Sequence, residues 1–152
     1  MKTIEIREAT VVDLPTLADM FDLYRQFYGQ PPNRSLALRF LSDRFAKRES
    51  LILVADSFPN GLIGFCQLYP TFCSVEAAPI YSLYDLFVLP NSRQVGAGRL
   101  LLLAAQRQAK IDGKVRLDLT TAKSNTAAQL LYESERWIRD EMFFAYSKQV
   151  GK

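Results

Sequence analysis

The segment from Tyr84 to Leu103 constrains the fold more than any other part of the chain. It begins with an apolar run, passes through a short stretch that contains Gly96 and Gly98, and ends in consecutive leucines. This order predicts a buried strand, a glycine loop and an apolar helix. The first N–H groups of a helix have no intrahelical acceptor and lie at the positive end of its dipole, and glycine lets a ligand approach the backbone. The segment therefore predicts a phosphate-binding site.

The periodicity of the remaining sequence predicts one mixed α/β domain over residues 1–152. Thr10 and Asp13 resemble a capping box at a helix start, and Phe58-Pro-Asn-Gly is typical of a hairpin turn. The expected order is β-α-α-β-β-β-α-β-α-β, in which a largely antiparallel first half precedes a βαβ unit. The predicted strands span 3–7, 51–55, 62–72, 80–88, 115–121 and 142–148, and the predicted helices span 10–28, 35–48, 98–110 and 125–134.

The composition excludes several classes of protein. With 19 basic and 16 acidic residues the net charge is only +3, which is too weak and too scattered to indicate nucleic-acid binding. No apolar run approaches the length of about 20 residues that a membrane span needs, and the amino terminus does not resemble a signal peptide. Cys66 and Cys73 lack metal-ligand spacing. We therefore expect a cytoplasmic protein with reduced thiols.

The absence of histidine limits the chemistry that the chain can perform. Without histidine, the Ser-His-Asp and Cys-His mechanisms are excluded, and most zinc sites with them. We expect no metal cofactor. Acid–base chemistry must then use aspartate, glutamate, tyrosine, cysteine, lysine, the backbone or water.

The glycine loop by itself allows more than one interpretation. It lacks the third glycine of the dinucleotide fingerprint, and no Gly-Lys-Ser/Thr follows as in a Walker loop. Its glycines could serve only a strand-to-helix turn, or the loop could bind the phosphates of a nucleotide. The second possibility predicts tight ATP binding without competition by coenzyme A.

Two motifs together resemble the GNAT superfamily of N-acetyltransferases over nearly the whole chain. Arg93-Gln-Val-Gly-Ala-Gly is similar to the Gln/Arg-x-x-Gly-x-Gly/Ala element of that family. Downstream, Asn125-Thr-Ala-Ala-Gln-Leu-Leu-Tyr-Glu is similar to its second signature. The segment Tyr24-Arg-Gln-Phe-Tyr resembles the branch of diamine and fungal histone-type acetyltransferases. The resemblance implies transfer of an acetyl group from acetyl-coenzyme A (acetyl-CoA) to a primary amine by direct attack.

The resemblance also implies which residues bind acetyl-CoA. The strand 80–88 is expected to splay from the strand 115–121, so that the pantetheine arm can pair with the exposed backbone. Asn125 is expected to hydrogen-bond the same arm, although an asparagine heading a helix is also an ordinary N-cap. Arg93 and Arg99 could contact phosphates or simply be solvated. The implied cofactor-binding residues are Leu86, Phe87, Val88, Arg93, Gln94, Val95, Gly96, Ala97, Gly98, Arg99 and Asn125.

Two residues are candidates for catalysis. The resemblance implies that Tyr132 protonates the departing thiolate, although an aromatic residue on a helix face can also be core. Asp85 could attract the ammonium group of the acceptor or relay its proton, and the N–H of Val88 or a neighbour could polarise the thioester carbonyl. A structural salt bridge would equally explain Asp85. The family usually has glycine where this chain has Arg136, and a left-handed backbone there would strain an arginine.

The sequence indicates the residues that would bind the amine acceptor less specifically than those that would bind acetyl-CoA. Strand alternation places Asp85 and Phe87 on one face of their strand and Tyr84 and Leu86 on the other. The expected acceptor is a small-molecule amine, either polyamine-like or lysine-like, and the expected assembly is a homodimer. An alternative is a catalytically silent module that binds an acyl-CoA. Candidate aromatic residues for holding a cationic amine, any of which could instead be core, are Tyr24, Phe27, Tyr28, Tyr69, Phe72 and Tyr81.

Overall fold

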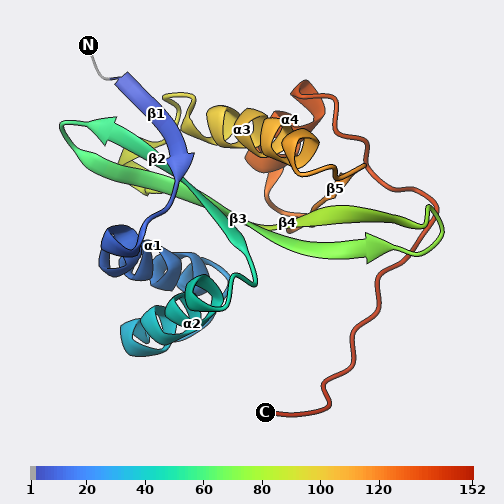
Figure 1. The fold of residues 1–152 in the computed structure, drawn as a ribbon, viewed down its shortest axis with the longest axis horizontal. Coiled ribbons are helices and arrows are strands. Elements are labelled where there is room, and N and C mark those ends of the chain that lie inside the picture. The colour runs from blue at the N-terminus through green and yellow to red at the C-terminus, as the bar shows by residue number, and fades with distance from the viewer. Residues whose placement is uncertain (1–2) are drawn as a thin grey trace. The chain divides into compact units, whose positions relative to one another are not determined.

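The computed structural model of the protein describes residues 3–152, which form two units, one up to Thr120 and one over Thr121–Lys152 (Figure 1). The first unit contains a five-stranded sheet in the order β1-β2-β3-β4-β5. The strands are antiparallel to their neighbours except for β5, which is parallel to β4. Their bounds are β1 Thr3–Glu8, β2 Leu51–Phe58, β3 Gly61–Cys73, β4 Ala78–Val88 and β5 Leu117–Asp118. The predicted mixed α/β fold is confirmed for these elements.

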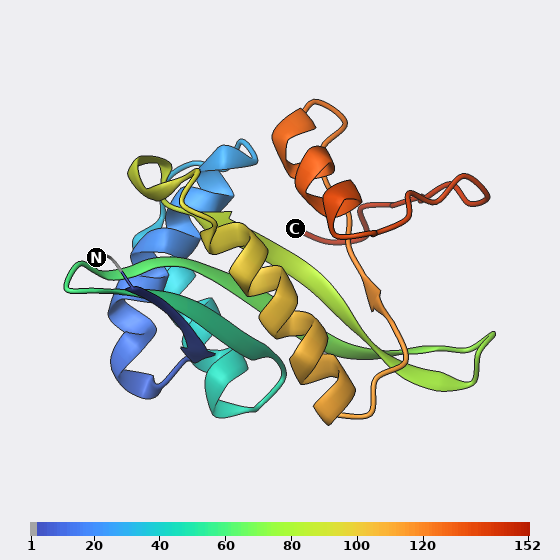
Figure 2. The same ribbon diagram turned by 90° about the horizontal axis from the view of Figure 1, so that it is seen from above.

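Helices cover both faces of the sheet of the first unit (Figures 1 and 2). Helices α1 (Leu14–Phe27) and α2 (Arg34–Ala46) lie on one face, and α3 (Ala97–Ile111) lies on the other. Apolar residues at helical spacing on α1 and α2 pack against the alternate inward residues of β2, β3 and β4, as amphipathic elements must. The resulting core includes Leu17, Met20, Phe21, Leu41, Ile52, Val54, Phe65 and Phe87.

The start of α1 is fixed by local polar contacts. Thr10 and Asp13 form the predicted capping box around the short 3₁₀ turn Val11–Asp13, and the Thr10 N–H donates to Asp13 Oδ2 at 2.7 Å. Arg7 of β1 donates to both carboxylate oxygens of Asp13, at 2.8 and 3.0 Å. This ion pair and the Thr10 hydrogen bonds lower the pKa of Asp13 to about 2 against the opposing effect of burial. The carboxylate therefore joins the first strand to the first helix.

A β-bulge interrupts the pairing of β3 with β4. Gln67 pairs with Asp85, but the next residue, Leu68, pairs with Leu83, so Tyr84 is an extra residue on β4. Simple alternation predicted that Tyr84 faces away from Asp85. The prediction was wrong, because the extra residue breaks the alternation and both side chains line the same cavity.

The last strand of the first unit pairs only briefly. The sequence predicts a strand over 115–121, whereas β5 contains Leu117–Asp118 alone. Its ladder with β4 consists of Tyr81 opposite Leu117 and Ser82 opposite Asp118. Beyond Ser82, β4 and β5 separate, as the splayed strand pair requires.

The second unit contains α4 (Thr126–Ser134) and an irregular chain. The predicted final strand over 142–148 is wrong, since the structure assigns neither helix nor strand to residues 135–152. The aromatic residues of that segment are typical of a strand, but a strand exists only when a partner satisfies its backbone. Its large apolar side chains, Met142, Phe143, Phe144 and Tyr146, are exposed.

Helix α4 ends at a left-handed arginine. Arg136 has φ +63°, its N–H donates to the Glu133 carbonyl at 3.0 Å, and the Trp137 N–H donates to the Tyr132 carbonyl at 3.0 Å. These two hydrogen bonds form a Schellman motif, whose left-handed position glycine occupies at least cost. Arg136 therefore has the left-handed backbone conformation that was expected to strain an arginine at this position.

Replacing Arg136 with glycine is expected to raise the free energy of unfolding by up to about 1 kcal/mol, because glycine removes the left-handed strain but also gains entropy in the unfolded chain. Urea denaturation measures this change. The matched control is Glu133→Gly, at the second-last residue of α4. Because glycine is unfavourable within a helix, this variant is expected to lower the free energy of unfolding by about 1 kcal/mol. A lower stability of Arg136→Gly would contradict the assignment of strain.

Candidate active site

The glycine loop begins after the short 3₁₀ turn Pro90–Ser92 and leads into α3. Gly96 is the N-cap residue, with φ +87°, and Gln94 also has a positive φ of 62°. A Cβ at Gly96 would meet no atom within 4 Å, so the backbone angle, and not lack of space, favours glycine there. Because glycine has no capping side chain, Gly96 does not cap α3 with a side-chain hydrogen bond, and the first-turn N–H groups lie at the positive end of the helix dipole, which favours an anion.

Arg93 ties the loop to the end of β4. Its Nε donates to the Val88 carbonyl at 3.1 Å, and its guanidinium carbon lies 5.8 Å from the centre of the Phe87 ring. The sequence predicted a phosphate contact for this arginine, and the structure adds a positioning role within the loop. Arg99 is exposed in the first turn of α3. The loop residues named for the cofactor are thus brought together at one helix start.

The separated part of β4 directs backbone groups toward the open side of the sheet. The Leu89 N–H donates to the Ile63 carbonyl of β3 at 2.8 Å. Neighbouring residues of a strand point their N–H groups in opposite directions, so the N–H groups of Val88 and Leu86 point away from β3. Phe87 instead pairs with Phe65 of β3, and its ring lies in the core. Of the three residues named on this strand, Leu86 and Val88 carry the available amides.

Asp85 is buried on the α1 and α2 side of β4 and is only 3% exposed. Gln67, which is fully buried, donates its Nε2 to Asp85 Oδ2, and Ser50 Oγ donates to Gln67 Oε1 at 2.7 Å. Burial raises the pKa of Asp85 above the usual range of an aspartate, and hydrogen bonds from Gln67 and Tyr24 partly oppose this. The contacts that the structure describes for this carboxylate are hydrogen bonds to neutral groups, and no ion pair is among them.

A cavity of about 610 Å³ opens beside Asp85. This volume is typical of a small-molecule site. Desolvation by burial raises the pKa of both Tyr24 and Tyr69, so these phenols stay protonated at neutral pH. Most of the wall is aromatic, and Asp85 is the one carboxylate among the lining residues, which are Phe21, Tyr24, Phe40, Tyr69, Thr71, Ser82, Tyr84 and Asp85.

The aromatic candidates from the sequence divide into two groups. Tyr24 and Tyr69 line the cavity, whereas Phe27, Tyr28, Phe72 and Tyr81 are absent from its wall. Tyr81 instead donates its hydroxyl to Asp112 Oδ2 at 2.6 Å.

Sequence reasoning missed several residues of the wall and its support. The missed residues are Phe21, Phe40, Thr71, Ser82 and Tyr84 in the wall, and Gln67 and Ser50 in its support. A polar Gln67 in the middle of a long apolar strand was the one signal that could have indicated a buried partner for Asp85.

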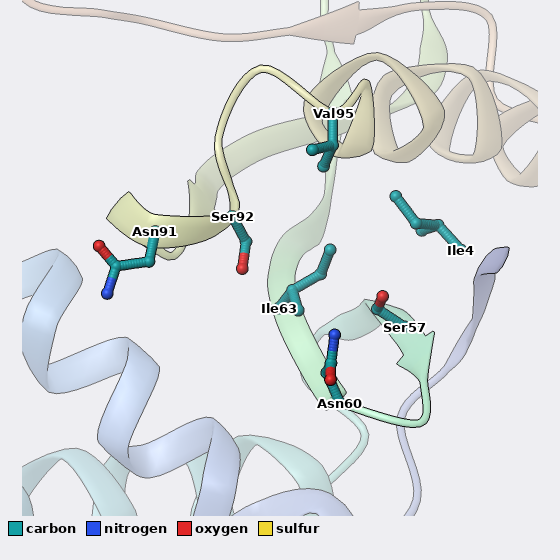
Figure 3. A pocket seen from close by; sticks show the side chains of 7 residues that line it. All are labelled: Ile4, Ser57, Asn60, Ile63, Asn91, Ser92 and Val95. Carbon is teal, nitrogen blue, oxygen red and sulfur yellow. The ribbon is translucent and has the colours of Figure 1, made fainter. Parts of the chain in front are cut away.

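A second cavity, of about 120 Å³, lies next to the glycine loop and is drawn in Figure 3. Its lining side chains come from β1, from the region of the β2–β3 turn and from the segment that precedes α3: Ile4, Ser57, Asn60, Ile63, Asn91, Ser92 and Val95. Of the residues predicted to bind the cofactor, only Val95 borders it. Its volume is below that of typical ligand pockets, and it carries no functional assignment.

The remaining two predicted site residues belong to the second unit. Asn125 is the N-cap of α4, and its Oδ1 accepts a hydrogen bond from the Ala128 N–H at 3.2 Å. The ring of Tyr132 lies 6.1 Å from the ring of Trp137. The roles of both residues toward the cofactor stay predictions.

Residues 3–152 contain neither a helix that could span a membrane nor a cluster of metal-ligating side chains. The helices found there are too short or too polar to cross a bilayer. Over the same range, acidic and cysteine side chains do not gather into a group that could hold a metal ion.

Comparison with known proteins identifies the family. Residues 17–136 match the acetyltransferase (GNAT) family, and the chain belongs to this family. It is therefore an acetyl-CoA-dependent N-acetyltransferase.

Individual relatives agree with this assignment. The chain is 43% identical to the uncharacterized N-acetyltransferase YhfO of Bacillus subtilis (strain 168), over 97% of this chain and 98% of that protein. It is also 35% identical, over 54% of this chain and 56% of that protein, to a probable acetyltransferase of Haemophilus influenzae.

Solved structures agree as well. The crystal structure of a probable acetyltransferase has a TM-score of 0.89 at 33% identity, covering 97% of this chain and 99% of that one. An aminoglycoside N-acetyltransferase, AAC(6′)-Iy, in complex with CoA has a TM-score of 0.82 at 20% identity, covering 98% and 97%, and shows the shared fold alone.

Proposed function

We propose that the cavity beside Asp85 binds a primary amine and that acetyl-CoA binds along the opposite side of β4. One observation carries this proposal: a single strand presents both halves of the site. Asp85 faces the aromatic cavity, and the amides of Leu86 and Val88, one and three residues later, point toward the open edge. An amine and a thioester bound on either side would meet at this strand.

The residues present fit acetyl-CoA as a substrate. The amides from Gln94 to Arg99, with the glycine N-cap between them, suit a diphosphate at the positive end of α3. The amides of Leu86 and Val88 suit the amide-bearing pantetheine arm, which can add to the edge like a strand. In our proposal Asn125 hydrogen-bonds the same arm, as the family resemblance implies.

Each residue then has a defined task in the transfer. Bound acetyl-CoA supplies an acetyl thioester that a neutral amine attacks directly. Asp85 attracts the ammonium form of the acceptor and accepts its proton, directly or through water. The Val88 N–H donates to the carbonyl oxygen as negative charge develops on it. As the carbon–sulfur bond breaks, Tyr132 donates its proton to the departing thiolate. The nitrogen of the new amide releases its extra proton to solvent, and Tyr132 regains a proton from solvent.

We propose one N-acetyltransferase domain over 1–152 that acts in the cytoplasm on a small-molecule or lysine-like amine, as the resemblance to the diamine and fungal histone-type branch suggests. The exposed apolar side chains around Phe143 support a homodimer. Light scattering coupled to size-exclusion chromatography measures the oligomeric state.

Release of free thiol from acetyl-CoA in the presence of primary amines tests the proposed activity. We expect amine-dependent release together with the acetylated amine as product. Coenzyme A binding without thiol release for any amine would support the silent module instead. Tight ATP binding that coenzyme A does not displace would favour a nucleotide site.

Replacing Gly96 with alanine is expected to raise the KM for acetyl-CoA about fivefold, because alanine is strained by about 1 kcal/mol at this left-handed angle. The free loop then relaxes to another conformation, and binding has to restore the strained one. The KM for the amine should stay unchanged. Gly113→Ala is the matched control, since Gly113 also has a positive φ (+70°) and an open Cβ position but lies outside the loop. An equal rise in both variants would contradict a specific role for the loop.

A further inference from the structure

We infer that the acceptor is a primary amine with one positive charge on an apolar or aromatic body, and that polyamines are poor substrates. This inference rests on the proposed function, because it concerns the amine that enters the cavity beside Asp85. Of the two acceptor types that the sequence left open, polyamine-like and lysine-like, it excludes the polyamine-like one.

The cavity offers one anionic partner. Asp85 is the single carboxylate among its lining residues. Gln67 donates a hydrogen bond to this carboxylate, and Ser50 in turn donates one to Gln67. A buried carboxylate without an ion pair favours the binding of one cation, because the cation would neutralise a negative charge that has lost its hydration. The polar lining residues Thr71 and Ser82 are neutral. A second ammonium group would therefore have no counter-charge in the wall.

The rest of the wall suits an apolar body. Phe21 and Phe40 stack with their ring centres 5.5 Å apart and an interplanar angle of 13°. Tyr69 and Tyr84 meet edge to face with their ring centres 5.9 Å apart. Rings in these arrangements form a preorganised surface for an aliphatic chain or another ring. Removing such a body from water favours binding in proportion to its apolar area.

A positive charge already lies against this wall. The guanidinium carbon of Arg44 lies 4.7 Å from the centre of the Phe40 ring, and its Nε is 3.6 Å from Glu49 Oε1. Arg44 thus uses the attraction that this ring offers to a cation, with Glu49 as only a partial counter-charge. A ring face can attract a second ammonium group, but it replaces little of the lost hydration.

Three amines of graded charge and shape test the inference at neutral pH. Butylamine and putrescine have the same four-carbon chain and differ by one ammonium group, whereas 2-phenylethylamine adds a ring. We expect kcat/KM to be about tenfold higher for butylamine than for putrescine, and higher again for 2-phenylethylamine. Calorimetric titration of the same amines in the presence of coenzyme A should give the same order of affinity.

A charge introduced into the wall provides a second test. Thr71 lines the cavity from an exposed position on β3. Thr71→Asp is expected to raise the ratio of kcat/KM for putrescine over butylamine about fivefold, because it supplies the missing counter-charge. Thr71→Asn has nearly the same shape without the charge, and it should leave the ratio unchanged. An unchanged ratio in Thr71→Asp would overturn the inference.

The outcomes separate this inference from the proposed function. If putrescine is acetylated as well as butylamine or better, the substrate class is wrong and the amine acetyltransferase activity stands. If the amines bind in the expected order without thiol release, the substrate class stands and the transfer reaction fails. If none of the three amines binds or reacts, both are overturned.

Discussion

Replacing Tyr132 with phenylalanine is expected to lower kcat by about 100- to 10,000-fold, the range that a lost general acid accounts for. The phenol is suited to this role because its ordinary pKa of about 10 lies near the value of about 8.5 for a thiol, so proton transfer to the thiolate costs only about 2 kcal/mol. The KM for acetyl-CoA should change little, since the hydroxyl acts on the leaving group. Steady-state thiol release with a saturating amine measures both constants.

The structure provides a control for this variant. Phenylalanine keeps the ring that lies 6.1 Å from the Trp137 ring, so the packing within the second unit should be retained. Tyr146→Phe makes the same chemical change at an exposed position of that unit and should leave kcat unchanged. If Tyr132→Phe retained wild-type turnover while thermal unfolding confirmed its fold, the proton would have to come from another group.

The elements that the sequence predicted well are those fixed by local signals. The capping box of Thr10 and Asp13 starts α1, and the left-handed Gly96 starts α3, and each signal lies within a few residues of the feature it determines. The two strands that differ from prediction depend on distant partners. Strand β5 is short because its ladder with β4 stops at Asp118, and residues 142–148 have no assigned strand although their pattern would allow one.

The candidate site was partly predictable for the same reason. Asp85 attracted attention because a carboxylate inside an apolar strand needs an explanation. Its support by Gln67 depends on the register of β3 against β4, and the place of Tyr84 depends on the bulge between them. No local pattern encodes that extra residue.

The aromatic wall shows a further limit of sequence patterns. Phe21 and Phe40 follow the apolar periodicity of two different helices, and that periodicity assigns each of them to the core. Only the packing of α1 against α2 brings the two rings together at the edge of a cavity. Side chains that are part core and part binding surface therefore look like core in the sequence.

Asp85→Asn is expected to lower kcat/KM for the amine about 100-fold, because a buried ammonium group would lose its charged partner. The KM for acetyl-CoA should stay near its wild-type value. Asparagine keeps an oxygen that accepts the hydrogen bond from Gln67, so the support of this position is retained. Asp43→Asn, on the exposed surface of α2, is the matched control and should not affect the amine.

The same variant should change the pH dependence of catalysis. Burial raises the pKa of Asp85, so in the wild type kcat/KM for the amine should fall as the pH decreases through this raised value, because the neutral carboxyl no longer attracts an ammonium group. Tyr24, Tyr28 and Tyr69 around it have raised pKa values too and remain neutral in this range. Asp85→Asn should lack this acidic limb.

Stability should change in the opposite direction to activity. Because the pKa of Asp85 is higher in the folded than in the unfolded chain, the folded protein binds more protons between the two values, and this carboxyl makes folding less favourable as the pH rises. At pH 7 Asp85→Asn should therefore have a higher free energy of unfolding than the wild type. The difference should shrink as the pH falls toward 4. Urea denaturation at both pH values measures it, and a less stable variant at pH 7 would indicate that the carboxylate has a structural role.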